Sequence, residues 1–193
     1  GAANPLVRRE DGLGGWTLRG FNTDFNGVIE PLQDRIGDLG GVEVAVVGNG
    51  GAARGAVQAL LDSGACPSIY YRSEESGGPV ARELGVDSGP IDGLEAGAQR
   101  VVINATPLGL VPGDPSPVPE AVFDSATIAF DMVYDPPETQ FLLDARSRGS
   151  ETIGGDEMLV AQGLVQFELF TGMKATKEDF QRNLREARDA DCP

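Results

Sequence analysis

An apolar run that ends in glycine, "VEVAVVG" at residues 42–48, constrains the fold more than any other stretch of the chain. The run is rich in β-branched residues and shows no regular alternation of polar side chains. This pattern is typical of a strand that is buried on both faces of a parallel sheet. A helix is predicted directly after it, over residues 52–63, with Gly64 as its stop signal.

The rest of the chain repeats this alternation of strand and helix. Further strands are predicted over residues 68–72, 100–106, 126–134 and 151–153, and helices over 79–85, 137–149, 157–172 and 177–188. Upstream, residues 4–20 predict two short strands joined by a turn at Asp11-Gly12, and helical spacing follows over 22–39, with Pro31 near its first turns. The pattern predicts an α/β fold with a Rossmann-like, doubly wound parallel sheet.

The glycines after the first buried strand suggest a nucleotide site. Gly48-x-Gly50-x-x-Ala53 lies between a strand and a helix, as the dinucleotide-binding fingerprint requires. Gly48 would allow the tight turn, Gly50 would let the backbone approach a pyrophosphate, and Ala53 would let the helix pack closely. We therefore expect the loop to bind a cofactor through residues Gly48, Asn49, Gly50, Gly51 and Ala52. The alternative is an ordinary tight turn between strand and helix.

Arg72, at the end of the next predicted strand, bears on the choice of cofactor. An acidic residue at this position would bind the ribose 2′-hydroxyl of NAD, whereas an arginine can pair with a 2′-phosphate. Arg72 and the adjoining Ser73 therefore predict NADP. Glu74 and Glu75 partly offset this argument, and a solvated arginine is the alternative.

Composition limits the possible functions. The 193 residues carry a formal net charge of −15, which argues against a nucleic-acid footprint and against a polybasic membrane patch. No apolar run reaches the length of a membrane span. With no histidine and two distant cysteines, a metal site is not expected, and a reducing, cytoplasmic location is. Cys66 is expected to be a small buried residue, and Trp16 is expected to pack a small core.

Six stretches in order resemble the shikimate dehydrogenase family: "GFNTDFNG", "VVGNGGAARGAV", "YYRS", "NATPLGL", "DMVYDPPETQFL" and "GGDEMLVAQGLVQFELFTG". The resemblance runs from "GAAN" to about Leu184. It implies an N-terminal substrate domain, an NADP-binding Rossmann domain, and reversible hydride transfer between NADPH and 3-dehydroshikimate, a small-molecule substrate. The expected division is a remnant of the α/β substrate domain at 1–23, the Rossmann domain at 24–175, and a C-terminal helix and tail at 176–193.

The resemblance also implies roles for single residues. Asp24 matches the family's catalytic aspartate, although on its own "NTD" would read as a helix N-cap. The substrate-binding matches are Asn4, Tyr134 and Gln162; a core tyrosine and a solvent-facing glutamine are the alternatives for the last two. Those expected to border the cofactor are Asn104, Thr106, Gly155 and Met158.

Several positions depart from the family pattern. Tyr71 replaces a usual asparagine, and Ser76 stands where many members have a second basic residue. The family's serine pair and catalytic lysine lie upstream of "GAAN", and Lys174 and Lys177 do not match that lysine by motif. We therefore expect an N-terminally truncated family member that binds the dinucleotide but turns over poorly, whose full-length form could be fused to another shikimate-pathway domain. The rival readings are an NAD-dependent quinate/shikimate dehydrogenase and a non-catalytic dinucleotide-binding module.

Overall fold

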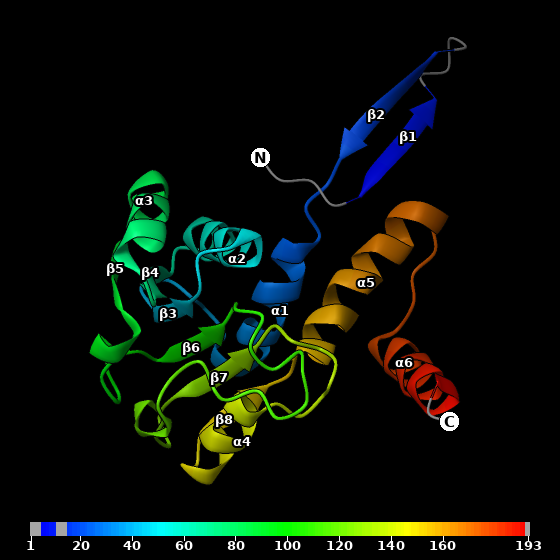
Figure 1. Ribbon diagram of the computed structural model, residues 1–193. Helices are drawn as coiled ribbons and strands as arrows, with labels where there is room; N and C mark the ends of the chain where they lie inside the picture. Colours follow the sequence, from blue (N-terminus) through cyan, green and yellow to red (C-terminus); the bar gives the residue numbers. More distant parts are fainter. Residues whose placement is uncertain (1–4, 11–14, 192–193) are drawn as a thin grey trace.

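A parallel sheet of six strands forms the centre of the molecule (Figure 1). The computed structural model describes residues 5–10 and 15–191. The strands lie in the order β5-β4-β3-β6-β7-β8, and each neighbouring pair is parallel. Their bounds are β3 (Glu43–Val47), β4 (Cys66–Tyr71), β5 (Asp87–Pro90), β6 (Val101–Asn104), β7 (Ile128–Asp131) and β8 (Glu151–Ile153). Numbered along the chain, this is the 3-2-1-4-5-6 order of a doubly wound fold, so the predicted fold class is confirmed.

Helices cover both faces of this sheet, and the strand residues alternate accordingly. Val44 and Val46 of β3 pack in the core under α1 (Asp24–Ile36), α2 (Gly51–Asp62) and α3 (Glu74–Leu84). Ala45 and Val47 pack on the opposite face with α4 (Gln140–Ser147) and the short 3₁₀ turns η1 (Ile91–Gly93) and η2 (Glu120–Val122). These four side chains of β3 are all fully buried, which explains the continuous apolar run in the sequence.

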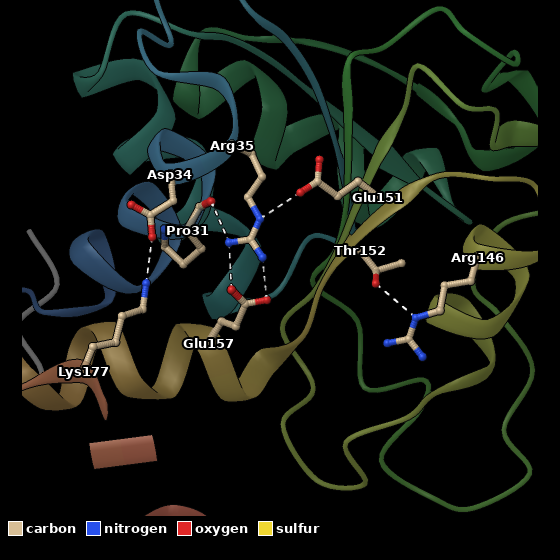
Figure 2. Close-up of polar contacts among 8 residues, drawn as sticks. All are labelled: Pro31, Asp34, Arg35, Arg146, Glu151, Thr152, Glu157 and Lys177. Carbon is tan, nitrogen blue, oxygen red and sulfur yellow. Dashed lines mark hydrogen bonds and ion pairs between the residues drawn. The ribbon is translucent and has the colours of Figure 1, made fainter. Parts of the chain in front are cut away.

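Helix α5 (Gly155–Thr171) packs along α1, and α6 (Lys177–Asp191) packs on α5. Arg35, in the last turn of α1, ties this group to the sheet (Figure 2). Its guanidinium binds Glu151 at the start of β8 at 3.3 Å and Glu157 in the first turn of α5 at 2.7 Å. Lys177 of α6 pairs with Asp34 of α1 at 2.7 Å. These contacts fix the start of α5 against α1 and the sheet edge.

Three local expectations about helices and strands are corrected by the structure. Strand β5 was not predicted, because its sequence "DSGP" lacks β-branched residues. The strand forms by pairing with β4. Helix α3 begins at Glu74, five residues before the predicted start, and contains Pro79. Pro31 is the eighth residue of α1 rather than part of its first turns. The helix continues through Pro31 because its neighbours Val28 and Leu32 are buried in the core. This tertiary packing outweighs the low helix propensity of proline.

The N-terminal strands β1 (Leu6–Glu10) and β2 (Trp16–Gly20) form a separate antiparallel pair that projects from the main body (Figure 1). The predicted turn at Asp11-Gly12 lies outside the described residues. Trp16 is 55% exposed and lies under the guanidinium of Arg8 at 5.0 Å, so the expectation that it packs a core is wrong. Cys66, the first residue of β4, is also exposed, so the expectation that it is buried is wrong.

Candidate functional site

A cavity of about 520 Å³ opens at the carboxyl ends of β3, β4, β6 and β7. In this strand order β3 and β6 are neighbours from the two halves of the sheet, and the crevice between their ends is the usual ligand site of such folds. Four segments at the strand ends form the walls, residues 48–52, 70–72, 105–107 and 132–134, together with Ile91 and Leu110. The sequence-predicted glycine loop therefore forms one side of this cavity.

Gly48 is required by the geometry of this wall. Its φ of +122° is rarely adopted by other residues, and a Cβ there would lie 2.8 Å from the carbonyl oxygen of Ala105. The N–H of Gly48 donates to Tyr70 O at 2.9 Å, which ties the turn to β4. Ala53 is fully buried against the core, as the fingerprint predicts for close packing of the helix.

The start of α2 offers a site for an anion. Gly50 is the N-cap residue and, as a glycine, has no side chain that could cap the helix. A Cβ on Gly50 or Gly51 would meet nothing within 4 Å, so the backbone at this point faces open space. The first N–H groups of a helix have no partner inside the helix, and its dipole favours negative charge there. The arrangement fits a pyrophosphate held by main-chain amides.

Arg72 stands at the rim of this cavity, directly after β4. Its side chain is exposed, and within the described part of the chain no carboxylate forms an ion pair with it. Ser73 is the N-cap residue of α3 and does not line the cavity. The guanidinium is thus the cation available to a phosphate at this end of the site.

A buried hydrogen-bond network fixes the opposite wall. Asn104, at the end of β6, is fully buried; its Nδ2 donates to Asp131 Oδ1 at 2.9 Å, and its Oδ1 accepts from the hydroxyl of Thr106 at 2.7 Å. Thr106 lines the cavity, whereas Asn104 does not. Asn104 was expected to border the cofactor, but the structure places it behind the cavity wall. There it fixes the position of the loop that follows β6.

Asp131 completes this network from the end of β7. It accepts hydrogen bonds from Val133 N at 3.0 Å and from the hydroxyl of Thr139. Burial raises the pKa of Asp131 to about 6, although the three donated hydrogen bonds act in the opposite direction. Sequence reasoning missed this residue; a lone charged side chain at the end of an apolar strand was the available signal.

A second cavity of about 340 Å³ lies beside the first. Gly51, Ala52, Met132 and Tyr134 line both, so the two spaces share a wall. The second cavity is further lined by residues of α1 and α5 that the resemblance singled out, namely Asp24, Gly155, Met158 and Gln162. Residues far apart in the sequence are thus brought together next to the glycine loop. Asn4 lies outside the described residues.

Gln162 brings an unpaired polar atom to this second cavity. Its Oε1 is buried and has no hydrogen-bond partner among the described residues. Buried polar atoms in folded proteins nearly always have a partner, so an unpaired one facing a cavity points to a ligand. The alternative of a solvent-facing glutamine does not agree with this burial.

Asp24 begins α1, in the first turn, where the helix dipole stabilises a carboxylate. The N-cap residue is Thr23, which makes no side-chain capping bond. Its hydroxyl instead accepts from Gln166 Nε2 of α5 at 2.8 Å, a contact that sequence reasoning did not anticipate. The pair holds the start of α1 against α5 on the side where Asp24 and Gln162 line the same cavity.

Gly155 is needed where α5 meets the end of β7. A Cβ at this position would overlap the backbone of Val133 and Tyr134, so only glycine lets the two elements touch. This contact places Met158, one turn further along α5, in the second cavity, where its side chain also packs against the core. The position of Met158 therefore agrees with the expected neighbour of a ligand and also with a residue that fills the core.

Two kinds of feature are absent from residues 5–10 and 15–191. No helix there is long and apolar enough to cross a bilayer. No group of three or more His, Cys, Asp or Glu side chains is arranged to hold a metal ion.

Known proteins are similar to this chain in both sequence and fold. Residues 155–182 match the family model described as the shikimate 5′-dehydrogenase C-terminal domain. The chain is 37% identical over 193 residues to the shikimate dehydrogenase (NADP(+)) of Methanocella arvoryzae, covering 97% of this chain and 69% of the relative.

Two solved structures are similar at the level of the whole chain. The shikimate 5-dehydrogenase of Thermus thermophilus, in complex with NADP(H) and shikimate, matches with a TM-score of 0.81 and 32% identity over 96% of this chain and 68% of that one. The quinate dehydrogenase of Corynebacterium glutamicum, in complex with NAD, matches with a TM-score of 0.80 and 26% identity over 96% of this chain and 68% of that one.

Proposed function

Because the chain belongs to the shikimate dehydrogenase family, we propose that it binds NADP(H) in the cavity beside the glycine loop and takes part in the reversible reduction of 3-dehydroshikimate to shikimate. One observation carries the proposal. The cavity built by the glycine loop shares a wall with a second cavity that contains Asp24 and the unpaired Oε1 of Gln162. A dinucleotide and a hydroxylated small molecule could therefore lie side by side.

The residues of the first cavity fit the dinucleotide. The amides at the start of α2 would hold its pyrophosphate, and Arg72 would pair with its 2′-phosphate. Thr106, on the loop after β6, lines the same cavity. When bound, NADPH supplies the hydride for the reduction.

The residues of the second cavity fit a polyhydroxylated substrate. Gln162 Oε1 can accept a hydrogen bond from a substrate hydroxyl, which would give that buried atom its partner. The Asp24 carboxylate can accept from another hydroxyl and hold a proton close to the reacting oxygen. Tyr134 lies at the wall common to both cavities, next to the place where substrate and cofactor would meet.

Cofactor binding by the 193-residue chain tests the proposal directly. Isothermal titration calorimetry should show saturable binding of NADP+, with weaker binding of NAD+. Arg72→Ala should weaken NADP+ more than NAD+, because only NADP+ carries the 2′-phosphate. Absence of binding for both dinucleotides would contradict the proposal.

Turnover is a separate measurement. General acid–base catalysis needs a proton donor and acceptor at the reacting oxygen, and no lysine lines either cavity in the part of the chain that is described. We therefore expect this chain to oxidise shikimate with NADP+ slowly or not at all. A rate comparable with that of a full-length family member would refute this expectation.

A second candidate, an NAD-dependent quinate or quinate/shikimate dehydrogenase, is favoured by one local feature. Glu74 and Glu75 follow Arg72 closely, and carboxylates near the 2′ position suit NAD. Rates with shikimate and quinate, each with NADP+ and NAD+, separate the two candidates. Arg72→Asp should shift the preference toward NAD+ if Arg72 binds a phosphate.

A further inference from the structure

Two carboxylates lie next to the proposed phosphate-binding arginine, and the structure keeps one of them away from it. Glu74 and Glu75 occupy the first turn of α3, two and three residues after Arg72. A carboxylate beside the guanidinium would neutralise it and would repel a 2′-phosphate, which carries up to two negative charges. Yet among the described residues Arg72 has no carboxylate within ion-pair distance.

Glu74 is instead held on the body of α3. Its Oε2 accepts a hydrogen bond from the hydroxyl of Tyr71, and its Oε1 lies 3.6 Å from Arg82 Nη1. Arg82 is eight residues further along the chain, near the end of the same helix. The carboxylate is therefore held between the Tyr71 hydroxyl and Arg82, and it forms no ion pair with Arg72.

Tyr71 is held in place by the core while its hydroxyl makes this contact. Only 6% of its surface is exposed, because its ring packs in the core while the hydroxyl reaches Glu74. A Cβ on Gly77 would overlap this ring, and a Cβ on Gly78 would overlap Glu74 Oε1. Two consecutive glycines inside a helix weaken it, but here they make room for the ring and for the carboxylate.

We propose that Tyr71 is a positioning residue for cofactor choice, which by holding Glu74 on α3 leaves the Arg72 guanidinium unpaired for a 2′-phosphate. The inference rests on the proposed function of the glycine-loop cavity and deepens it. Without the Tyr71 hydroxyl, Glu74 loses a hydrogen bond that favours its present rotamer, and its carboxylate can turn toward Arg72, which precedes the helix by two residues. The phosphate would then compete with a carboxylate for the same cation.

Tyr71→Phe removes only the hydroxyl and keeps the buried ring. Calorimetry on the full 193-residue chain should show NADP+ binding weakened about three- to tenfold, with NAD+ binding unchanged within about twofold, since NAD+ has no group for Arg72 to hold. The loss should shrink at high salt, because the competition is between exposed charges.

Tyr71→Phe/Glu74→Gln is the matched control. It lacks the same hydroxyl but has no carboxylate to release, so NADP+ binding should return to within about twofold of the wild type. A merely structural role of Tyr71 would weaken both dinucleotides equally and would not be rescued by Glu74→Gln.

The possible results separate the inference from the function on which it rests. If the wild type binds NADP+ and Tyr71→Phe leaves the ratio of NADP+ to NAD+ affinity unchanged, the inference is wrong and the proposed function stands. Failure of the double variant to recover NADP+ binding also overturns the inference. If the wild type binds neither dinucleotide, both are overturned.

Discussion

The buried carboxyl of Asp131 should make the stability of this protein depend on pH between about pH 4 and 6. Its pKa is raised from 3.8 to about 6, chiefly by burial. A carboxyl whose pKa is higher in the folded than in the unfolded state stabilises the fold when protonated. That contribution is complete below about pH 4 and is lost as the pH rises through about 6. The difference of about two pH units, at about 1.36 kcal/mol each, corresponds to about 3 kcal/mol in total.

Asp131→Asn tests this reasoning with little change of shape. The remaining Oδ1 can accept from Asn104 Nδ2 and Val133 N, as the aspartate oxygen does at 2.9 and 3.0 Å. The new amide can donate to the hydroxyl of Thr139, which now donates to the carboxylate. The variant therefore keeps the network and removes the buried charge, and we expect it to be more stable than the wild type at about pH 8.

Urea unfolding followed by circular dichroism between pH 5 and 8 measures the effect, in a range above the isoelectric point near 4.2. Wild-type stability relative to the variant should fall by about 1.4 kcal/mol across this range, roughly half of the total, because the folded-state pKa lies inside it. Asp131→Ala is the contrasting control, since it leaves buried donors unpaired and should destabilise the fold by about 1–3 kcal/mol at every pH. Parallel stability curves for Asp131→Asn and the wild type would refute the reasoning.

Two further predictions concern the walls of the cavities. Gly48→Ala should lower the free energy of unfolding by about 1–3 kcal/mol, because φ is +122° and a Cβ would lie 2.8 Å from Ala105 O; Gly51→Ala, whose Cβ meets open space, should melt close to the wild type while weakening NADP+ in calorimetry. Gln162→Met should raise the melting temperature, because it removes a buried oxygen that has no partner, and an unsatisfied group of this kind costs about 1–3 kcal/mol. A melting temperature well below that of the wild type would show that Gln162 has a structural partner after all.

The fold class could be predicted from the sequence, because the alternation of strands and helices shows in the local periodicity of apolar residues. The run "VEVAVVG" predicted a strand buried on both faces, and β3 is such a strand. The glycine pattern predicted a tight turn into a helix, which the positive φ of Gly48 confirms. Both conclusions follow from backbone geometry within about ten residues, which the sequence determines directly.

Elements without strong local signals were not predictable in the same way. Strand β5 exists because β4 offers it a hydrogen-bonding edge, and α3 continues through two glycines and a proline because Tyr71 and Glu74 pack there. Trp16 and Cys66, expected in a core, are exposed, since hydrophobic character alone does not say whether a neighbour will cover a side chain.

The sequence by itself thus determined the alternation of strands and helices, the turn at Gly48 and the types of side chain available for chemistry. Only the tertiary structure decided that Asp24, Tyr134 and Gln162, from three distant segments, line one cavity beside that turn, and that Asn104 lies behind the wall. The physical reason is that such placements depend on how α1 and α5 pack against each other and on the sheet. Those contacts join residues more than a hundred positions apart, as Arg35 with Glu157 and Thr23 with Gln166 do.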